Sequence, residues 1–210
     1  MEVKLDVLNK QQGIAVCFSA GVDSTAVLLH AIDQVGKDNV VALTTSVSPQ
    51  IISLHKAQNF YTSKICEMLE VKHHIIKSSF IPNSDKINFW GYHYWVYDAL
   101  SYALGNRNSI NRVWWGLNKD DEVHRFIVMH EKMFNYATEI HKVETKLIAP
   151  LRHLPKIEMY QRIPKKLLPF VWVCDFYKSK IANNDKTLKF VPCKKCKKCK
   201  EFDTLVLSKI

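Results

Sequence analysis

The sequence predicts an α/β protein with a Rossmann-like parallel sheet of five strands, helices on both faces and a metal-binding subdomain at the C-terminus. Short apolar runs alternate with longer stretches of helical periodicity, and this alternation is typical of parallel sheets. Four of the six cysteines lie in the last 37 residues, which indicates the appended subdomain. We therefore expect two parts, residues 1–165 and residues 166–210.

Five apolar runs carry the predicted sheet, and each is followed by a helical stretch or a turn residue. The expected strands are 13–18, 40–45, 73–77, 112–115 and 145–149. The expected helices are 25–35, 53–69, 88–104, 121–143 and 155–162. Helices that connect successive strands make those strands parallel.

Charge and composition favour an anionic partner away from a membrane. The 210 residues carry a formal net charge of +10 and are 47% hydrophobic. Nucleotides and nucleic acid are both compatible with that charge. No stretch reaches the roughly 18 apolar residues of a membrane helix, and residues 1–6 carry charges where a signal peptide would be apolar. We expect a cytoplasmic protein without a membrane partner.

A phosphate-binding loop is predicted at residues 19–24, between the first strand and the first helix. Backbone N–H groups at a helix N-terminus favour an anion, and Gly21 can adopt a positive φ there. Ser19 and Ser24 add hydroxyl donors, while Asp23 either caps the helix or contacts phosphate-bound Mg²⁺. The loop lacks the Gly-Lys-Ser/Thr of a Walker motif. An ordinary turn capped by Ser or Asp is the alternative.

The clustered cysteines predict a metal site. Three thiols recur at intervals of three residues and a fourth lies upstream, the ligand set being Cys174, Cys193, Cys196 and Cys199. Four thiolates satisfy tetrahedral Zn²⁺, which we expect, with an iron–sulfur cluster as the alternative. Cys17 and Cys66 are expected in the core.

The segment 18–25, Phe-Ser-Ala-Gly-Val-Asp-Ser-Thr, resembles the PP-loop of the ATP pyrophosphatase superfamily. The resemblance implies an adenine nucleotide α-hydrolase-like fold and an enzyme that adenylates an oxygen acceptor and releases pyrophosphate. Ala20 stands where the family usually has glycine, and a negative φ would accommodate its methyl group. The implied ATP-binding residues in this segment are Phe18, Ser19, Ala20, Gly21, Val22, Asp23, Ser24 and Thr25.

Later segments match the same superfamily at the ends of further strands. The resemblance places Leu43 and Thr44 beside the adenine, and Gly116 and Asp120 beside the nucleotide, where Asp120 holds Mg²⁺ or orients the substrate. Lys156, after Pro150-Leu-Arg, resembles a family lysine that neutralises developing charge. The expected catalytic residues are Ser19, Asp23 and Lys156. A surface role is the alternative for Lys156.

The C-terminal cysteine pattern resembles that of the 7-cyano-7-deazaguanine synthases. Cys199 is followed by Lys200 and Phe202, as a basic residue and phenylalanine follow in that family. The resemblance implies conversion of 7-carboxy-7-deazaguanine, ammonia and ATP to a nitrile, with a structural zinc ion. Residues 46–50 and 122–126 depart from the family's usual substrate segments. The expected partners are a deazapurine and ammonia; a homodimer stays open, and nucleic acid is not favoured.

Two other functions remain open. One is a PP-loop enzyme that modifies tRNA, which the basic charge favours. The other is a non-catalytic nucleotide-binding component of a defence assembly, which Ala20 and the departing substrate segments favour. The aromatic run 89–95 could stack a base, although helix packing is the preferred interpretation.

Overall fold

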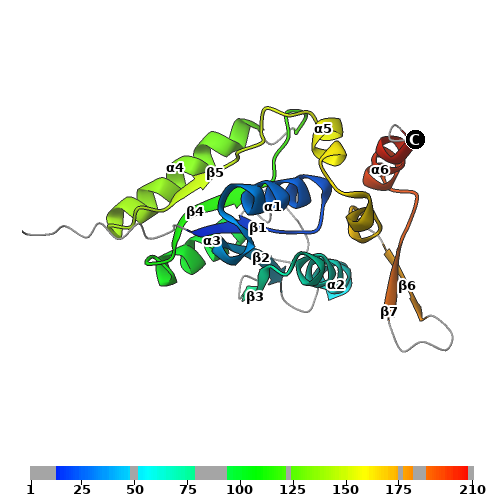
Figure 1. The fold of residues 1–210 in the computed structure, drawn as a ribbon, viewed down its shortest axis with the longest axis horizontal. Coiled ribbons are helices and arrows are strands. Elements are labelled where there is room, and N and C mark those ends of the chain that lie inside the picture. Colours follow the sequence, from blue (N-terminus) through cyan, green and yellow to red (C-terminus); the bar gives the residue numbers. More distant parts are fainter. Residues whose placement is uncertain are drawn as a thin grey trace, which may run out of the picture.

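The sheet has the architecture that the sequence predicts. The computed structural model describes residues 13–47, 52–78, 94–121, 124–174, 177–181 and 188–207. Five parallel strands lie in the order β3-β2-β1-β4-β5 (Figure 1). They are β1 (Gly13–Cys17), β2 (Val40–Val47), β3 (Lys72–Ser78), β4 (Ile110–Trp115) and β5 (Lys146–Ile148). The predicted α/β fold class is confirmed.

Helices cover both faces of this sheet. They are α1 (Val22–Val35), α2 (Ile52–Leu69), α3 (Tyr94–Gly105), α4 (His124–Ile140) and α5 (Lys156–Gln161). One core contains Ile14 and Val16 of β1 with side chains of α1, α2 and α5. The opposite core contains Ala15 with side chains of α3 and α4. Successive strand residues point to opposite faces, so β1 is buried on both sides.

The observed helix bounds differ from the predicted ones by a few residues. The helix expected over 88–104 is described from Tyr94, and residues 79–93, with most of the aromatic run, lie outside the described residues. The helix expected to reach residue 143 ends at Ile140. Lys142 has a φ of 53°, and the Val143 amide bonds back to the Thr138 carbonyl at 2.9 Å. This is a left-handed helix stop that needs no glycine.

The C-terminal segment contains elements that the sequence reading did not predict. After a 3₁₀ turn (Lys165–Phe170), β6 (Tyr177–Ile181) and β7 (Leu188–Pro192) form an antiparallel hairpin, and α6 (Lys197–Leu207) follows. Buried residues of this segment, among them Leu167 and Phe190, belong to the same core as β1 and α1. The expected boundary at residue 165 stays a prediction.

The strand order reverses at β1, and this position defines the functional edge. The chain passes from β1 outward to β2 and β3, and then returns to the other side with β4. β1 and β4 end level, because Cys17 pairs with Trp115, whereas β2 continues to Val47, four residues beyond the Leu43 that pairs with Cys17. Open parallel sheets bind ligands at the carboxyl edge where the order reverses.

None of the described helices is both long and apolar enough to span a bilayer.

Candidate active site and metal centre

The phosphate loop (residues 19–24) leaves β1 and enters the first turn of α1. Ser24 Oγ lies 3.1 Å from Ser19 Oγ and accepts the Ser19 amide at 3.2 Å. The Gly21 amide points at Ser19 Oγ at 3.4 Å. Amides in a first helical turn have no earlier helical carbonyl to bond. The Ser19 and Ser24 hydroxyls therefore hold the shape of the loop. The amides from Val22 to Ser24 lie in the first turn of α1, directly after this loop.

The backbone of this loop differs from expectation at Ala20 and Gly21. Ala20 has a φ of 61°, and Gly21 has a φ of −70°. Ala20 thus does not have the negative φ that would accommodate its methyl group most easily, and Gly21 does not adopt the positive φ that is open to it. Ala20 is fully buried and its carbonyl accepts the Trp172 amide at 2.8 Å. Surrounding contacts thus hold a non-glycine residue in the left-handed region.

Asp23 lies at the start of α1 and faces Lys156 at the start of α5. Its Oδ2 is 4.0 Å from Lys156 Nζ, and its Oδ1 accepts a hydrogen bond from Asn118 Nδ2 at 3.0 Å. Burial raises the pKa of the Asp23 carboxyl, while Lys156 and the Asn118 amide lower it. Gly21 is the N-cap of α1, and α1 has no side-chain cap hydrogen bond. The capping role considered for Asp23 is therefore not what this structure shows.

Asn118 is a site residue that the sequence reading missed. Its side chain is 1% exposed, and its Nδ2 joins Asp23 to Asp121 Oδ2, with both distances 3.0 Å. Its Oδ1 accepts the Asp120 amide at 2.8 Å. A loop asparagine normally suggests a solvated turn. Its burial and its hydrogen bond to Asp23 show that it orients the Asp23 carboxylate.

Gly116 and Asp120 determine how β4 and α5 lie against the phosphate loop. A Cβ on Gly116 would lie 2.5 Å from the Ser24 amide nitrogen and 2.6 Å from the Asp23 carbonyl carbon. Only a glycine allows β4 to approach the first turn of α1 so closely. Asp120 Oδ2 accepts the Lys156 amide at 3.1 Å, and so fixes the start of α5. This contact positions Lys156.

These groups converge on a cavity of about 440 Å³ at the carboxyl edge of the sheet. Its walls include most of the expected nucleotide residues, namely Phe18, Ser19, Gly21, Val22, Asp23, Ser24, Leu43 and Gly116, and also Lys156, which is an expected catalytic residue. The structure does not place Ala20, Thr25, Thr44 or Asp120 in this lining. Thr44 Oγ1 instead bonds the Phe18 carbonyl at 2.9 Å and His73 Nε2 at 2.8 Å. Nucleotide contact at these four residues stays a prediction.

The cavity wall on the α3 side is aromatic. Trp95 and Trp115 lie there with ring centroids 4.8 Å apart, beside Cys17 at the end of β1. Burial, together with the Asp98 carboxyl, raises the pKa of the Cys17 thiol to about 12. Cys17 is thus protonated at neutral pH and is a weak nucleophile. Cys17 packs against the core as expected, and it also forms part of the cavity wall.

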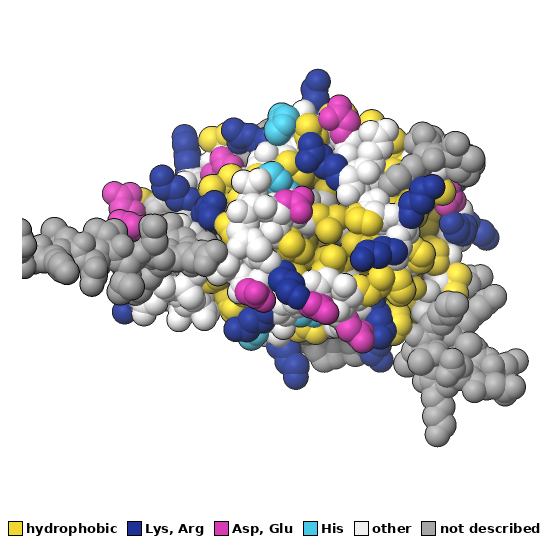
Figure 2. Space-filling model, viewed as in Figure 1, with side chains coloured by type: hydrophobic (Ala, Val, Ile, Leu, Met, Phe, Trp, Pro, Cys, Tyr) yellow, Lys and Arg dark blue, Asp and Glu magenta, His cyan; other side chains and the backbone are white. Residues whose placement is uncertain are grey.

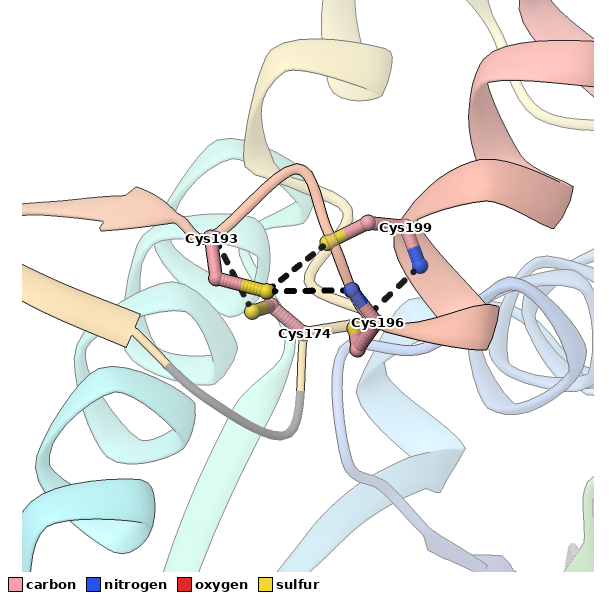
Figure 3. A group of neighbouring side chains, drawn as sticks. All are labelled: Cys174, Cys193, Cys196 and Cys199. Atoms are coloured by element: carbon pink, nitrogen blue, oxygen red, sulfur yellow. Dashed lines mark hydrogen bonds between the residues drawn. The ribbon is translucent and has the colours of Figure 1, made fainter.

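The four C-terminal cysteines form a compact sulfur cluster. Cys174, Cys193, Cys196 and Cys199 place their Sγ atoms within 4.8 Å of one another (Figure 3). Amides donate to these sulfurs, with Cys193 N 3.1 Å from Cys174 Sγ and Cys196 N 3.4 Å from Cys193 Sγ. Hydrogen bonds of this kind support metal-bound thiolates. The donor set therefore fits a metal ion.

Comparison with known proteins shows a shared fold. No protein-family model matches this chain, and no curated protein matches it in sequence. The U34-tRNA thiolase NcsA from Methanococcus maripaludis, solved with its [4Fe-4S] cluster, matches with a TM-score of 0.56 at 16% identity. The match covers 86% of this chain and 62% of the thiolase, so this chain spans under two thirds of that protein.

Two synthetases match more weakly. An NH3-dependent NAD synthetase from Campylobacter jejuni has a TM-score of 0.47 at 20% identity, over 73% of this chain and 63% of its own. An NMN synthetase from Francisella tularensis has a TM-score of 0.45 at 17% identity, and the match covers 74% of this chain and 64% of the synthetase.

Proposed function

We propose that this chain binds ATP in the cavity and transfers AMP to an acceptor carboxylate, with release of pyrophosphate. One observation carries the proposal: the phosphate loop, Asp23 and Lys156 line a single cavity at the reversal point of the sheet. The loop comes from β1 and α1, and Lys156 comes from α5, so two distant segments supply donors to the same space. The resemblance of residues 18–25 to the PP-loop supports the same chemistry.

In this reaction an acceptor oxygen attacks the α-phosphorus, and the bond from that phosphorus to the bridging oxygen breaks. Pyrophosphate leaves with the electron pair. Amides of the first turn of α1 and the Lys156 ammonium stabilise its charge. Asp23 would supply one carboxylate to Mg²⁺, which proteins commonly hold with one or two carboxylates and substrate phosphates. Asn118 keeps the Asp23 carboxylate oriented for that contact.

The acceptor we propose is 7-carboxy-7-deazaguanine, with ammonia as the second substrate and a nitrile as the product. The cysteine pattern at the C-terminus supports this choice by its resemblance to the synthases of that compound. Ammonia displaces AMP from the adenylated carboxylate and loses a proton, which gives an amide. The amide oxygen then attacks the α-phosphorus of a second ATP with release of pyrophosphate, and AMP leaves with that oxygen while the nitrogen loses two protons, which gives the nitrile. The aromatic wall of Trp95 and Trp115 is suited to a planar heterocycle.

We propose zinc for the cysteine cluster. Four sulfurs around one Zn²⁺ at about 2.3 Å lie roughly 3.8 Å apart, which requires a compact set. The sulfurs here lie within 4.8 Å of one another, whereas an iron–sulfur cluster spreads its ligands around several irons. Zinc here would hold Cys174 against the knuckle formed by Cys193, Cys196 and Cys199.

Mass spectrometry of the products tests the assignment. Incubation with ATP, Mg²⁺, ammonia and 7-carboxy-7-deazaguanine should yield AMP, pyrophosphate and the nitrile. Lys156→Ala should lower AMP formation by about 100-fold, because a charge-stabilising group is lost. Lys119→Ala, an exposed lysine nearby, serves as the control. If AMP stays at background while ATP binds, the acceptor is wrong; if ATP does not bind, adenylation itself is excluded.

A tRNA-modifying enzyme is the second candidate, favoured by the net charge of +10 and the exposed lysines of the cysteine knuckle. The structural neighbour NcsA is a tRNA thiolase, although the likeness extends only to the fold. The same assay with tRNA in place of the deazapurine discriminates the two. AMP release that depends on tRNA, with binding that weakens steeply with salt, would favour this candidate.

A further inference from the structure

The metal centre and the phosphate loop are joined by three consecutive residues. The Trp172 amide donates to the Ala20 carbonyl at 2.8 Å, and Cys174, two residues later, is a cluster ligand. Trp172, Val173 and Cys174 all line the cavity. One short segment is therefore bonded to the loop at one end and fixed in the sulfur cluster at the other.

A second path leads from the cluster to Trp172. The Trp172 ring stacks on Tyr61 with centroids 4.8 Å apart and planes 12° from parallel. The Tyr61 hydroxyl donates to the Phe190 carbonyl of β7 at 2.7 Å, three residues before Cys193. Cys193 in turn donates its amide to Cys174 Sγ at 3.1 Å. The two segments that supply Cys174 and Cys193 therefore both hold Trp172 in place, one through the backbone and the other through Tyr61.

Helix α6 forms a cavity wall that depends on the same cluster. Lys198, Glu201, Phe202 and Leu205 line the cavity, and their spacing of three, one and three residues places them on one helical face. The helix begins at Lys197, between the ligands Cys196 and Cys199. Two candidate metal ligands therefore fix the N-terminal end of this cavity-lining helix.

Ala20 makes this connection important for binding. A φ of 61° is disfavoured for alanine and persists only where neighbours hold it, and the Trp172 amide is one such neighbour. We propose that metal binding by the four cysteines positions the phosphate loop and α6, so that the cavity accepts its ligand only when the metal is bound. The ligand's identity as ATP rests on the proposed function; the coupling of metal to loop does not.

Hydrogen exchange followed by mass spectrometry tests the coupling without any nucleotide. The full chain is compared before and after chelation of its metal, with the chelator removed. We expect amides of residues 18–25 and of Trp172 to exchange at least about tenfold faster without metal, as a loss of local protection requires. Peptides of α4 should keep their protection. Equal protection of the loop in both forms would overturn the inference.

Nucleotide binding is then measured by calorimetry with Mg²⁺ and an ATP analogue that resists cleavage. The metal-loaded chain should bind at least about tenfold more tightly than the metal-free chain, a difference well within the range of site coupling, and added Zn²⁺ should restore binding. Equal affinity overturns the inference. Absence of binding in the metal-loaded chain would instead refute the proposed function, while the exchange experiment would still decide the coupling.

A pair of metal-loaded variants tests the role that the inference gives to α6, and this test holds even if chelation unfolds the sheet. Phe202→Ala removes a cavity-facing ring of α6, and Thr204→Ala removes an exposed side chain of the same helix. Both should retain the metal. Phe202→Ala should weaken nucleotide binding by about tenfold, as expected for a lost wall contact, while Thr204→Ala should not. Equal affinities of the two variants would show that α6 does not form part of the site.

Discussion

Two residues of the site, Ala20 and Asn118, have roles that follow from burial and backbone conformation. Ala20 holds a φ of 61°, and Asn118 donates to two carboxylates while only 1% exposed. Neither property is visible in residue type or spacing. The residues with a chemical signature, Asp23, Lys156 and the cysteines, could be selected from the sequence because their chemistry is carried by the side chain itself.

Replacement of Ala20 by glycine tests the strained loop. Ala20→Gly and Ala26→Gly both remove a buried methyl group, because the two residues are 0% and 1% exposed. Glycine relieves the left-handed strain at position 20, worth about 1–2 kcal/mol, but weakens the helix at position 26. Chemical denaturation should therefore show Ala20→Gly to be at least about 1 kcal/mol more stable than Ala26→Gly. If both variants lost the same free energy of unfolding, this result would contradict the positive φ of Ala20.

Acidification tests the Asp23–Asn118 pair. The raised pKa of Asp23 means that the folded chain binds this proton more tightly than the unfolded chain. The contribution of the Asp23 carboxyl to folding stability therefore improves as the pH falls through its raised pKa. Over the same pH range Mg²⁺-dependent nucleotide binding should be lost, because the protonated carboxyl no longer attracts the ion. Asn118→Ala removes a hydrogen bond that lowers this pKa, so the acid loss of binding should move to higher pH.

The control for this shift is Asn106→Ala. Asn106 Nδ2 bonds the Tyr102 carbonyl at 2.8 Å, after α3 and close to the start of β4. It should cost stability without moving the pH profile of nucleotide binding. An unchanged profile in Asn118→Ala would show that Asn118 does not act through the Asp23 carboxylate.

At the level of elements, the sheet could be predicted because β1, β2 and β4 contain apolar runs between helical stretches, and the shorter β3 and β5 fit the same alternation. The hairpin and α6 could not. Residues 177–181 are Tyr-Lys-Ser-Lys-Ile and lack an apolar run, residues 188–192 end in a proline, and the cysteines in 193–199 indicated a metal loop rather than a helix start. The contact of β4 with α1 was also hidden, because a glycine after a strand does not reveal what lies against it.

Gly116 tests that contact. Gly116→Ala would place a methyl carbon 2.5 Å from the Ser24 amide nitrogen, so the first turn of α1 must shift. We expect a loss of about 1–3 kcal/mol in the free energy of unfolding, as for other overpacked sites, together with weaker nucleotide binding. Gly105→Ala is the matched control, since a Cβ there meets nothing within 4 Å. Similar behaviour of both variants would contradict the close approach.

At the scale of the whole molecule, the C-terminal segment shares the core of the sheet. Leu167 and Phe190, which are 0% and 6% exposed, belong to the same buried cluster as Ile14 and Leu28. Figure 2 shows apolar side chains gathered near the middle of one face, with Lys and Arg side chains around them. The division at residue 165 was drawn from a change in composition, and composition does not show which apolar residues share a core.

Removal of residues 166–210 tests this sharing. The shortened chain should lack a cooperative thermal transition, because Met159, Tyr160 and other core residues would lose their neighbours. Circular dichroism and calorimetry measure the transition. The full chain with bound metal should melt in one step. A shortened chain with a native-like transition would show that the sheet folds as an independent unit.

The aromatic walls of the cavity give the protein an internal optical probe. Trp95, Trp115 and Trp172 line the cavity, which is three of the five tryptophans in the chain. Trp114 stacks instead on His30, with centroids 5.4 Å apart. Indole emission responds to stacking and to the exclusion of water. Intrinsic fluorescence should therefore report when the cavity fills, without a label and before any product forms.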